Sequence, residues 1–209
     1  MKKVAILLIN FRTVEFTEQC ISSLKKISYH SSKIYVLDNG SQDNSSKKLK
    51  RIKGINLSIS NTNLGFAEGN NILIRKAIKD GADYVILLNN DTVVKEDFIS
   101  ELLTVAESSS DIGIVGPKIY YFEPKNKIWF AGGRINFFIG DARHIGVNQI
   151  DNNLFTSVKE VDYITGCAML VKREVIDKIV SEYPKSTSIE EQSEQVRKLL
   201  ESYIKENKK

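Results

Sequence analysis

Asp91 is the side chain of this sequence that best suits metal chemistry. It follows the apolar run 83–88, "DYVILL", with Asn89 and Asn90 in between. A hard divalent cation such as Mg²⁺ or Mn²⁺ binds through one or two carboxylates together with phosphate oxygens, so Asp91 and a diphosphate would suffice. Asparagine and aspartate also favour turns. The residues alone leave two interpretations open, a metal site and a polar turn.

Polar residues also follow the other apolar runs that we interpret as strands. They are Asn10 after 4–9, Asp38 and Asn39 at the end of 33–38, and Asn61 and Asn63 after 55–60. In a parallel sheet covered by helices, ligands bind beyond the carboxyl ends of the strands. We therefore expect these side chains to gather around one crevice. There, a carboxylate such as that of Asp38 can accept hydrogen bonds from a ribose or a base edge.

The stretch 61–71, "NTNLGFAEGNN", is a second candidate ligand-binding segment. Gly65 and Gly69 flank a predicted loop that leads into a helix over 70–81. Glycines let a ligand approach the backbone closely, and a helix N-terminus favours an anion. The stretch matches neither the Walker pattern nor GxGxxG. A solvent-exposed helix entrance therefore remains the alternative.

The histidines and cysteines form no recognisable catalytic or metal motif. His30 and His144 have no serine or cysteine partner that would indicate a nucleophilic triad. Cys20 and Cys167 lie in no CxxC or Cys/His cluster, so we expect two buried thiols rather than a zinc site. Free thiols favour a cytoplasmic location.

Apolar runs of strand length alternate with helical patterns through the first half of the chain. We expect strands at 4–9, 33–38, 55–60, 83–88 and 112–117. We expect helices over 16–27, 70–81 and 95–108, and a short basic helix that ends at Gly54. Thr13 is expected to cap the first helix and Gly81 to end the third. This alternation predicts an α/β fold, with a mostly parallel sheet and helices on both faces.

The second half has a different composition. Residues 118–163 are rich in aromatic residues and glycine and predict short, partly antiparallel strands, whereas 161–175 predicts a strand and then a helix. Residues 181–209 predict a polar linker and an amphipathic helix that begins with the capping box Ser188 and Glu191. We expect this helix to pack on its own domain or on a second copy in a homo-oligomer. The predicted domains are 1–180 and 181–209.

The composition is that of a globular protein. The 209 residues include 42% hydrophobic and 27% charged residues, with a formal net charge of +4 and a pI of about 8.9. Mild basicity suits anionic ligands or an acidic membrane surface and does not require nucleic acid. No apolar run approaches the roughly 20 residues that span a bilayer. "MKKVAILLINF" is expected to be a first strand rather than a signal peptide. We expect a cytoplasmic protein, with peripheral attachment to the inner face of the membrane as an open alternative.

Five segments occur in an order that matches a known enzyme family. They are "LINFRTVEFTEQCISSL", "VLDNGSQDNS", "NTNLGFAEGNN", "YVILLNNDTVV" and "VDYITGCAMLVKREV". Each segment is modest alone, but the five in sequence are specific. Over residues 3–180 the chain resembles the family 2 glycosyltransferases, and it is most similar to their rhamnosyltransferase-like branch.

The resemblance implies a GT-A fold, a UDP- or dTDP-linked sugar donor and a divalent metal, Mn²⁺ or Mg²⁺. Asp91 matches the last residue of the family's DxD-type metal motif, with Asn89 at the first acidic position. Asp38 matches the aspartate that contacts the nucleotide. The other matched positions are Asn10, Asn63, Gly65 and Asn70 around the donor, and His144, Gly166 and Ala168 towards the acceptor.

The resemblance also implies an inverting transfer to a saccharide or lipid-linked acceptor in polysaccharide biosynthesis. An aspartate or glutamate would take the proton of the attacking hydroxyl. After 171–180 the family has a "GxFDExFF…ED" segment that supplies this base, whereas this chain has "SEYPKSTSIEEQ". We therefore assign no catalytic base, not even Glu182, Glu190 or Glu191. Two alternatives remain, a non-catalytic nucleotide-sugar-binding protein and a self-association module.

Overall fold

The structure of the protein is a computed structural model that describes residues 1–182. Residues 1–173 form one compact unit and residues 174–209 are assigned to a second. The predicted linker and C-terminal helix, apart from residues 181–182, lie outside the described residues. None of the helices in residues 1–182 has the length and apolarity needed to cross a bilayer.

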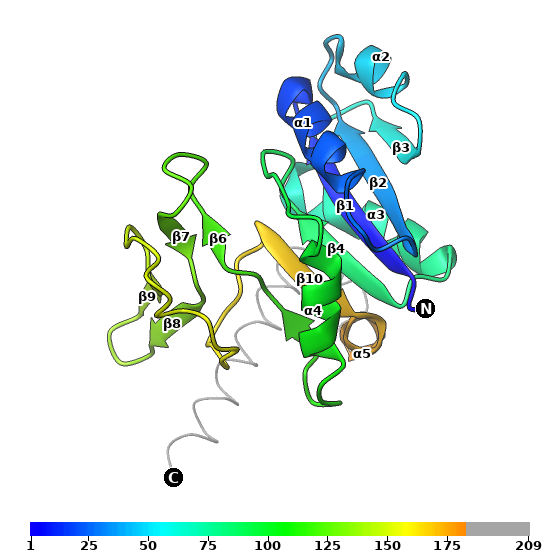
Figure 1. The fold of residues 1–209 in the computed structure, drawn as a ribbon. Helices are drawn as coiled ribbons and strands as arrows, with labels where there is room; N and C mark the ends of the chain where they lie inside the picture. The colour runs from blue at the N-terminus through cyan, green and yellow to red at the C-terminus, as the bar shows by residue number, and fades with distance from the viewer. Residues whose placement is uncertain (183–209) are drawn as a thin grey trace. The chain divides into compact units, whose positions relative to one another are not determined.

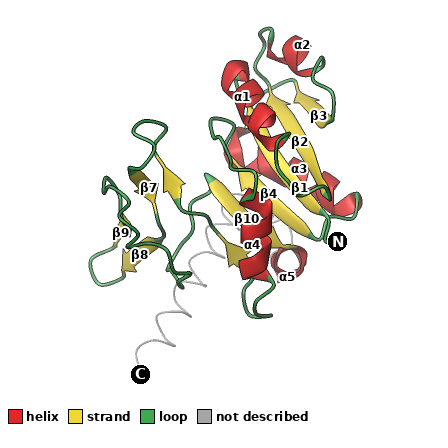
Figure 2. Ribbon diagram, in the orientation of Figure 1, coloured by secondary structure: helices red, strands yellow, loops and turns green. Residues whose placement is uncertain are grey.

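Strands and helices alternate through the first half, as predicted (Figures 1 and 2). They are β1 (Val4–Asn10), α1 (Val14–Leu24), β2 (Ser32–Asn39), α2 (Ser45–Leu49), β3 (Ile55–Ser60), α3 (Gly65–Lys79), β4 (Tyr84–Leu88), α4 (Phe98–Ala106) and β5 (Ile114–Val115). The second half contains β6 (Ile119–Tyr120), β7 (Ile128–Phe130), β8 (Gly133–Asn136), β9 (Asp141–His144), β10 (Ala168–Lys172) and α5 (Arg173–Glu182).

The central sheet has the strand order β3-β2-β1-β4-β10-β5. β1 pairs in parallel with both β2 and β4, and β2 pairs in parallel with β3. β10 runs antiparallel between β4 and β5. The chain thus builds the sheet outwards from β1 to β3 and then returns to the other side of β1. The carboxyl ends of β1 and β4 flank this reversal, the place where open α/β sheets bind ligands.

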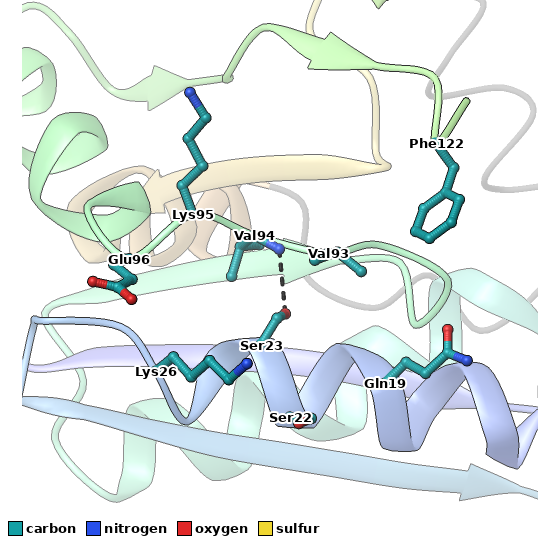
Figure 3. Close-up of a pocket in the computed structure, with 9 residues that line it drawn as sticks. All are labelled: Gln19, Ser22, Ser23, Lys26, Val93, Val94, Lys95, Glu96 and Phe122. Carbon is teal, nitrogen blue, oxygen red and sulfur yellow. Dashed lines mark hydrogen bonds between the residues drawn. The ribbon is translucent and has the colours of Figure 1, made fainter. Parts of the chain in front are cut away.

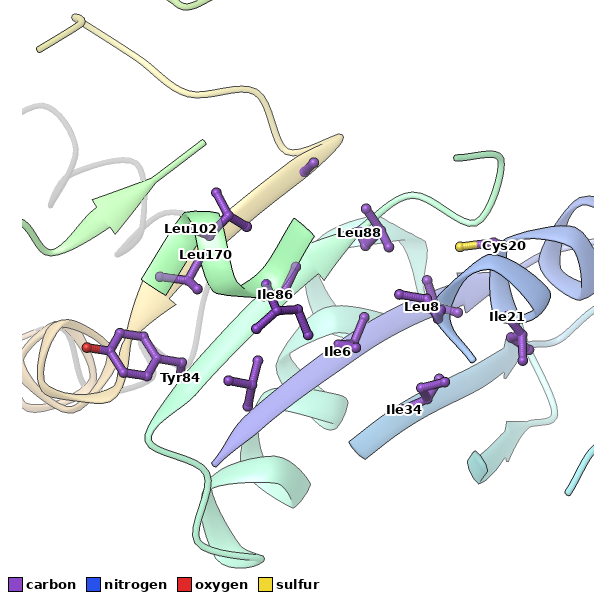
Figure 4. Close-up of a cluster of buried hydrophobic side chains, with 14 of the residues drawn as sticks. Ile6, Leu8, Cys20, Ile21, Ile34, Tyr84, Ile86, Leu88, Leu102 and Leu170 are labelled. Atoms are coloured by element: carbon purple, nitrogen blue, oxygen red, sulfur yellow. The ribbon is translucent and has the colours of Figure 1, made fainter. Parts of the chain in front are cut away.

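The two faces of the sheet bury alternate side chains of the same strands. On one face, Ile6 and Leu8 of β1 join an apolar cluster with residues of α1 and α4 (Figure 4). The other face lies against α3. There Gly69 packs so closely that a Cβ on it would come within 2.9 Å of Ile9 Cδ1 and 3.3 Å of Leu37 Cδ2. Helices therefore cover both faces, which confirms the predicted fold class.

Two predicted helix ends in the first half differ from the structure. Thr13 stands at the N-cap position of α1, but its side chain makes no capping hydrogen bond. Its hydroxyl accepts a hydrogen bond from Asn90 Nδ2 at 2.8 Å instead. Helix α2 ends at Leu49 rather than at Gly54, because the chain turns after Leu49 and reaches Gly54 in a left-handed conformation, with φ of +80°.

Helix α3 begins earlier than predicted, at Gly65. Two asparagine side chains satisfy N–H groups at its start, since Asn63 Oδ1 accepts from Gly65 N at 2.8 Å and Asn39 Oδ1 accepts from Leu64 N at 3.0 Å. Gly69 is consequently inside the helix and does not flank a loop. The predicted strand 112–117 is also shorter, Ile114–Val115.

The second half contains the small antiparallel part that the sequence predicted. β6 pairs with β7 and β8 pairs with β9, both antiparallel. Asp151 links the loop after β9 to β6 and the residue before it, because Asp151 Oδ2 accepts hydrogen bonds from Lys118 Nζ at 2.5 Å and from the hydroxyl of Tyr120. The chain then returns to the sheet as β10.

Candidate functional site

A cleft of about 290 Å³ opens at the carboxyl ends of β1, β2 and β4 and at the start of α3. Its lining residues are Ile9, Phe11, Asn39, Asn63, Gly65, Phe66, Asn70, Leu88, Asn89, Asn90 and Asp91. The structure thus brings together the sequence-predicted residues Asn63, Gly65, Asn70, Asn89 and Asp91. The cleft also lies at the reversal of strand order.

The segment that carries Asp91 is held by its backbone while the carboxylate stays free. Asn89 N donates to Cys167 O at 2.8 Å, and Asn89 O accepts from Thr92 Oγ1 at 2.8 Å. Asp91 itself is exposed, and within residues 1–182 its carboxylate has no hydrogen-bond or ion-pair partner. Its oxygens therefore keep all their acceptor capacity for a ligand.

Asn39 fixes the wall of the cleft formed by residues 63–65. Its side chain is 2% exposed and donates from Nδ2 to Asn63 Oδ1 at 3.0 Å and to Gly65 O at 3.1 Å, while Oδ1 accepts from Leu64 N. Gly65 has φ of +74°, a left-handed conformation that glycine adopts without strain. Asn39 was predicted to lie at the crevice from its position at a strand end, whereas its role in fixing residues 63–65 was not predicted.

Asn10 and Asp38 do not line the cleft but belong to a buried hydrogen-bond network that reaches it. Asn10 Nδ2 donates to Asp38 Oδ1 and to Ser41 Oγ, both at 3.1 Å. Thr17 Oγ1 donates to Asn10 Oδ1 at 2.9 Å and accepts from Asn90 Nδ2 at 2.8 Å. The network therefore joins β2 to the residue beside Asp91.

Sequence reasoning missed Thr17, although a signal for it was present. Thr17 is fully buried, on the same face of α1 as Val14, Cys20 and Ile21. A polar side chain on an otherwise apolar buried face needs a hydrogen-bond partner, because burial without one is costly. The partner in this case is the strand-end residue Asn10.

Asp38 keeps one carboxylate oxygen available. Oδ1 accepts the hydrogen bonds from Asn10 and Ser41, whereas Oδ2 accepts none within the described residues. Of the side-chain N and O atoms in that part of the chain, only Ser45 Oγ is both fully buried and without a partner. Asp38 Oδ2 therefore has access to solvent, although the residue is only 3% exposed.

Two aromatic rings give the cleft an apolar surface that the sequence analysis did not identify. Phe11 follows β1 and is 36% exposed, and Phe66 stands in the first turn of α3 and is 55% exposed. Exposed rings at a ligand cleft can stack on a flat ligand group. Their sequence positions, directly after Asn10 and Gly65, are the signal that could have found them.

Gly166 and His144, the residues predicted on the acceptor side, lie in different places. A Cβ on Gly166 would come within 3.4 Å of Phe66 Cζ, so Gly166 adjoins the edge of the cleft. Ala168 begins β10 and pairs with Leu88. His144 is not among the cleft residues, and its ring packs edge-on at 5.0 Å from the rings of both Trp129 and Phe130.

The two thiols beside the Asp91 segment are protonated. Burial raises the pKa of Cys20 to about 11, and the Asp91 carboxylate adds to the rise. Burial and the same carboxylate raise the pKa of Cys167 to about 11. Hard cations such as Mg²⁺ and Mn²⁺ prefer oxygen ligands to sulfur, so Asp91 is the better ligand for such a cation in this segment.

The donor set in the cleft suits a hard cation held in part by its ligand. Within residues 1–182, His, Cys, Asp and Glu side chains nowhere gather in groups of three or more that could enclose a metal. The cleft instead offers the free Asp91 carboxylate and the neutral oxygens of Asn89 and Asn90. Mg²⁺ and Mn²⁺ bind in this way when substrate phosphates complete the coordination.

A larger groove of about 520 Å³ lies between α1 and residues 93–96 (Figure 3). Ser23 Oγ of α1 accepts a hydrogen bond from Val94 N at 3.2 Å, and Phe122 lies across the groove from Gln19. The groove contains none of the sequence-predicted site residues. Its chemistry therefore gives no reason to prefer it to the cleft.

Solved structures with a similar fold are glycosyltransferases and related proteins named as follows. The fold is similar to that of mannosyltransferase PcManGT from Pyrobaculum calidifontis in complex with GDP-Man and Mn²⁺, with a TM-score of 0.58, 12% identity, and coverage of 86% of this chain and 47% of that one. It is also similar to S. aureus TarS 1–349, with a TM-score of 0.52, 13% identity, and coverage of 64% and 41%. TarS 1–349 in complex with UDP-GlcNAc has a TM-score of 0.51, 15% identity, and coverage of 58% and 36%.

These likenesses confirm the expected GT-A fold. The chain spans less than half the length of the solved chains it matches. A search of curated proteins found no match. Residues 5–180 match the model of the family described as glycosyl transferase family 2, and the chain therefore belongs to that family.

Proposed function

We propose that this chain binds a nucleotide-diphosphate sugar in the cleft and transfers the sugar to a saccharide or lipid-linked acceptor. The convergence of residues from several strand ends on one cleft, with Asp91 free and exposed, carries this proposal. Family membership supports the reaction class. The mannosyltransferase in complex with GDP-Man and TarS in complex with UDP-GlcNAc support a nucleotide sugar as the donor.

The two ends of the donor suit different groups, Asp38 of the buried network that reaches the cleft and the residues that line the cleft itself. Asp38 Oδ2 is the acceptor for a ribose hydroxyl or a base edge, and the Phe11 ring offers a surface for stacking. The wall at Asn63 and Gly65 lets a diphosphate approach the backbone near the start of α3, where a helix favours an anion. Among nucleotides we favour UDP and dTDP, on the resemblance of the sequence motifs.

Asp91 is the proposed metal ligand, with Asn89 beside it. A divalent cation bound there and to the diphosphate would offset the negative charge that develops on the leaving nucleoside diphosphate. Asp91 has no other partner to give up on binding the cation, within the described residues. The protein supplies few ligands, so the cation and the donor should bind cooperatively.

The proposed transfer inverts the configuration of the sugar. The acceptor hydroxyl oxygen forms a bond to the anomeric carbon while the bond from that carbon to the diphosphate oxygen breaks. The nucleoside diphosphate leaves with the electron pair, and the hydroxyl proton passes to a carboxylate base. We assign no residue to this base. On the resemblance of the motifs, we further propose a role in polysaccharide biosynthesis in the cytoplasm.

Binding without transfer is the second candidate function. After Val180 the sequence departs from the family pattern. This departure favours binding without transfer, because in the family the segment at this position supplies the catalytic base. The two candidates differ in turnover. Release of nucleoside diphosphate that depends on an added saccharide or lipid-linked acceptor would exclude a purely binding protein.

Thermal unfolding with nucleotides tests the proposed donor site. UDP, dTDP and GDP are each added with and without MnCl₂, and we expect UDP or dTDP with Mn²⁺ to raise the melting temperature most. A ligand at 100 times its Kd stabilises a protein by about 2.7 kcal/mol, which corresponds to roughly 5–10 °C for a chain of this size. Asp91→Ala should abolish the part of the shift that depends on Mn²⁺.

Asp111→Ala is the matched control for this experiment. Asp111 is exposed and does not line the cleft, so the variant should keep the full nucleotide shift. An unchanged melting temperature of the wild-type protein with all three nucleotides would overturn the proposal. A shift that Asp91→Ala leaves intact would remove only the metal assignment.

A further inference from the structure

The side chain of Asn90 is fixed by hydroxyl groups of α1 and its N-terminal flank. Asn90 Nδ2 donates to Thr13 Oγ1 and to Thr17 Oγ1, both at 2.8 Å. Asn90 also lines the cleft, next to Asp91. The direction in which its carbonyl oxygen points therefore affects any ligand bound beside Asp91.

Asp38 determines the polarity of the buried network, that is, which group of each hydrogen bond donates and which accepts. A carboxylate has acceptors only, so the neighbouring Asn10 must turn its Nδ2 group, a donor, towards Asp38 Oδ1. Ser41 Oγ also donates to that oxygen. Asn10 consequently presents its carbonyl oxygen Oδ1 on the opposite side, towards Thr17.

Thr17 transmits this polarity because a hydroxyl has a single proton. The proton goes to Asn10 Oδ1 at 2.9 Å, which is closer than the other acceptor within reach, Thr13 O at 3.3 Å. Thr17 Oγ1 is then an acceptor towards Asn90. The group of Asn90 that faces α1 has to be the amide Nδ2, and both of its protons are used there.

We propose that Thr17 is a positioning residue of the donor cleft. Because Asp38 fixes which groups of the network donate and which accept, Thr17 presents an acceptor to Asn90, and Asn90 Oδ1 is thereby turned away from α1 towards the cleft. Asn90 Oδ1 accepts no hydrogen bond within residues 1–182. A reversed carboxamide would present its N–H groups, which carry partial positive charge, towards a cation at Asp91. The correct orientation presents a neutral oxygen.

The effect of Thr17 on ligand binding rests on the proposed donor site. The orientation of Asn90 does not depend on that proposal. The geometry is tested without any ligand. In the wild-type protein, the Asn90 side-chain amide protons, assigned by their loss in Asn90→Ala, should exchange with solvent on the order of tenfold more slowly than those of a free asparagine. Thr17→Val should remove this protection, and Thr17→Ser should keep it.

Asp38→Asn is the second variant and addresses the start of the network. An asparagine can present either a donor or an acceptor to Asn10, so the polarity is no longer set and the protection of Asn90 should fall although Thr17 is intact. This variant keeps the test decisive if Thr17→Val does not fold. Unchanged Asn90 protection in a folded Thr17→Val or in Asp38→Asn would overturn the proposal.

The functional consequence is measured by calorimetric titration of UDP with and without Mn²⁺. The Kd without Mn²⁺ divided by the Kd with Mn²⁺ measures how much the cation strengthens binding. This ratio should fall about fivefold in Thr17→Val, the size expected for one oriented hydrogen bond, and Thr17→Ser should keep the wild-type ratio. Thr104→Val is the control, because Thr104 is exposed on α4 and its hydroxyl donates to the backbone oxygen Ser100 O, away from the cleft. A role in stability alone would lower the melting temperature without changing this ratio.

The two proposals fail in different ways. If the wild-type protein binds none of UDP, dTDP and GDP, the proposed function is wrong while the exchange experiment still decides the orientation of Asn90. If the wild type binds with a dependence on Mn²⁺ that Thr17→Val retains in full, Thr17 is not a positioning residue of the site.

Discussion

Asn39 stabilises the cleft wall through hydrogen bonds that reach both side chain and backbone. Its amide contacts Asn63, Leu64 and Gly65, and the residue is buried. The buried side chain therefore connects the end of β2 to the start of α3. Substitution would leave buried polar groups of the wall without partners, which is more costly than the loss of a solvent-exposed contact.

Asn39→Ala is expected to lower the free energy of unfolding by roughly 1–3 kcal/mol. Chemical denaturation with a common m-value measures the loss, and a nucleotide titration should show weaker binding as well. Asn56→Ala on β3 is the matched control, because within residues 1–182 the Asn56 side chain makes one hydrogen bond, a long one of 3.4 Å to Ile34 O. Equal losses in the two variants would contradict the role of Asn39.

For single residues, the sequence predicted several of the side chains that lie at the cleft. It did not predict how those side chains are oriented by their hydrogen bonds. Asn63, Gly65, Asn70, Asn89 and Asp91 meet at the cleft because strand ends of a parallel sheet meet at one edge. The partners of Asn10 and Asn90 on α1 were not predicted. A hydrogen bond between α1 and a strand end depends on the rotation of the helix about its axis, which the apolar pattern gives only approximately.

Among the elements, α3 depends on one small residue where it packs against the sheet. Gly69 lies inside the helix, where glycine costs about 1 kcal/mol relative to alanine. The close approach of Ile9 and Leu37 explains its presence, since a Cβ would come within 2.9 Å of the former. The helix therefore lies closer to β1 and β2 at this point than a larger residue allows.

Gly69→Val should destabilise the protein by about 1–3 kcal/mol, because its branched side chain would displace Ile9 and Leu37. Ala67→Val controls for the helix propensity of valine, since Ala67 is exposed on the same helix. Thermal or denaturant unfolding compares the two variants. A loss no greater than that of Ala67→Val would show that α3 can move away from the sheet at little cost.

The elements were predictable where their apolar patterns were long and uninterrupted. β1, β2, β3 and β4 appear close to the predicted bounds. The starts and ends of helices were less so, because the hydrogen-bond partners that end a helix come from elsewhere in the chain. Helix α3 illustrates this, since Asn39 and Asn63 accept the N–H groups at its start.

At the scale of the whole molecule, Asp151 in the second half of the chain contributes to the response of stability to acid. The hydrogen bond from Lys118, together with that from Tyr120, lowers the pKa of Asp151 from 3.8 to about 2. A carboxyl whose pKa is lower in the folded state stabilises the fold in full above its unfolded pKa, near pH 4. The stabilisation is lost as the pH falls towards 2.

Asp151→Asn should therefore reduce the dependence of the melting temperature on pH between 4 and 2. The variant should also be less stable than the wild type at neutral pH, and the two proteins should converge as the pH falls. Melting curves at several pH values measure both effects, with Asp111→Asn as the exposed control. Parallel curves for wild type and Asp151→Asn would contradict the assignment.

The fold class was predictable because alternation of strands and helices admits few arrangements. The order of the strands was not part of that prediction. The pairing of β10 between β4 and β5 depends on contacts between residues more than fifty positions apart, such as Leu170 with Val115. Local patterns do not encode such pairings.

That pairing has a consequence for engineering the protein. The chain leaves the sheet after Val115 and returns at Ala168. The two ends of the intervening segment are neighbours, because β5 pairs directly with β10, and β10 also pairs with β4. A segment whose ends are neighbours can change in length or sequence with a small entropic penalty. Residues 116–165 are therefore expected to be exchangeable, whereas Gly166 adjoins Phe66 and Cys167 O accepts from Asn89 N, so both should be kept. Grafting the corresponding segment of another family member would leave the strand ends that form the cleft in place.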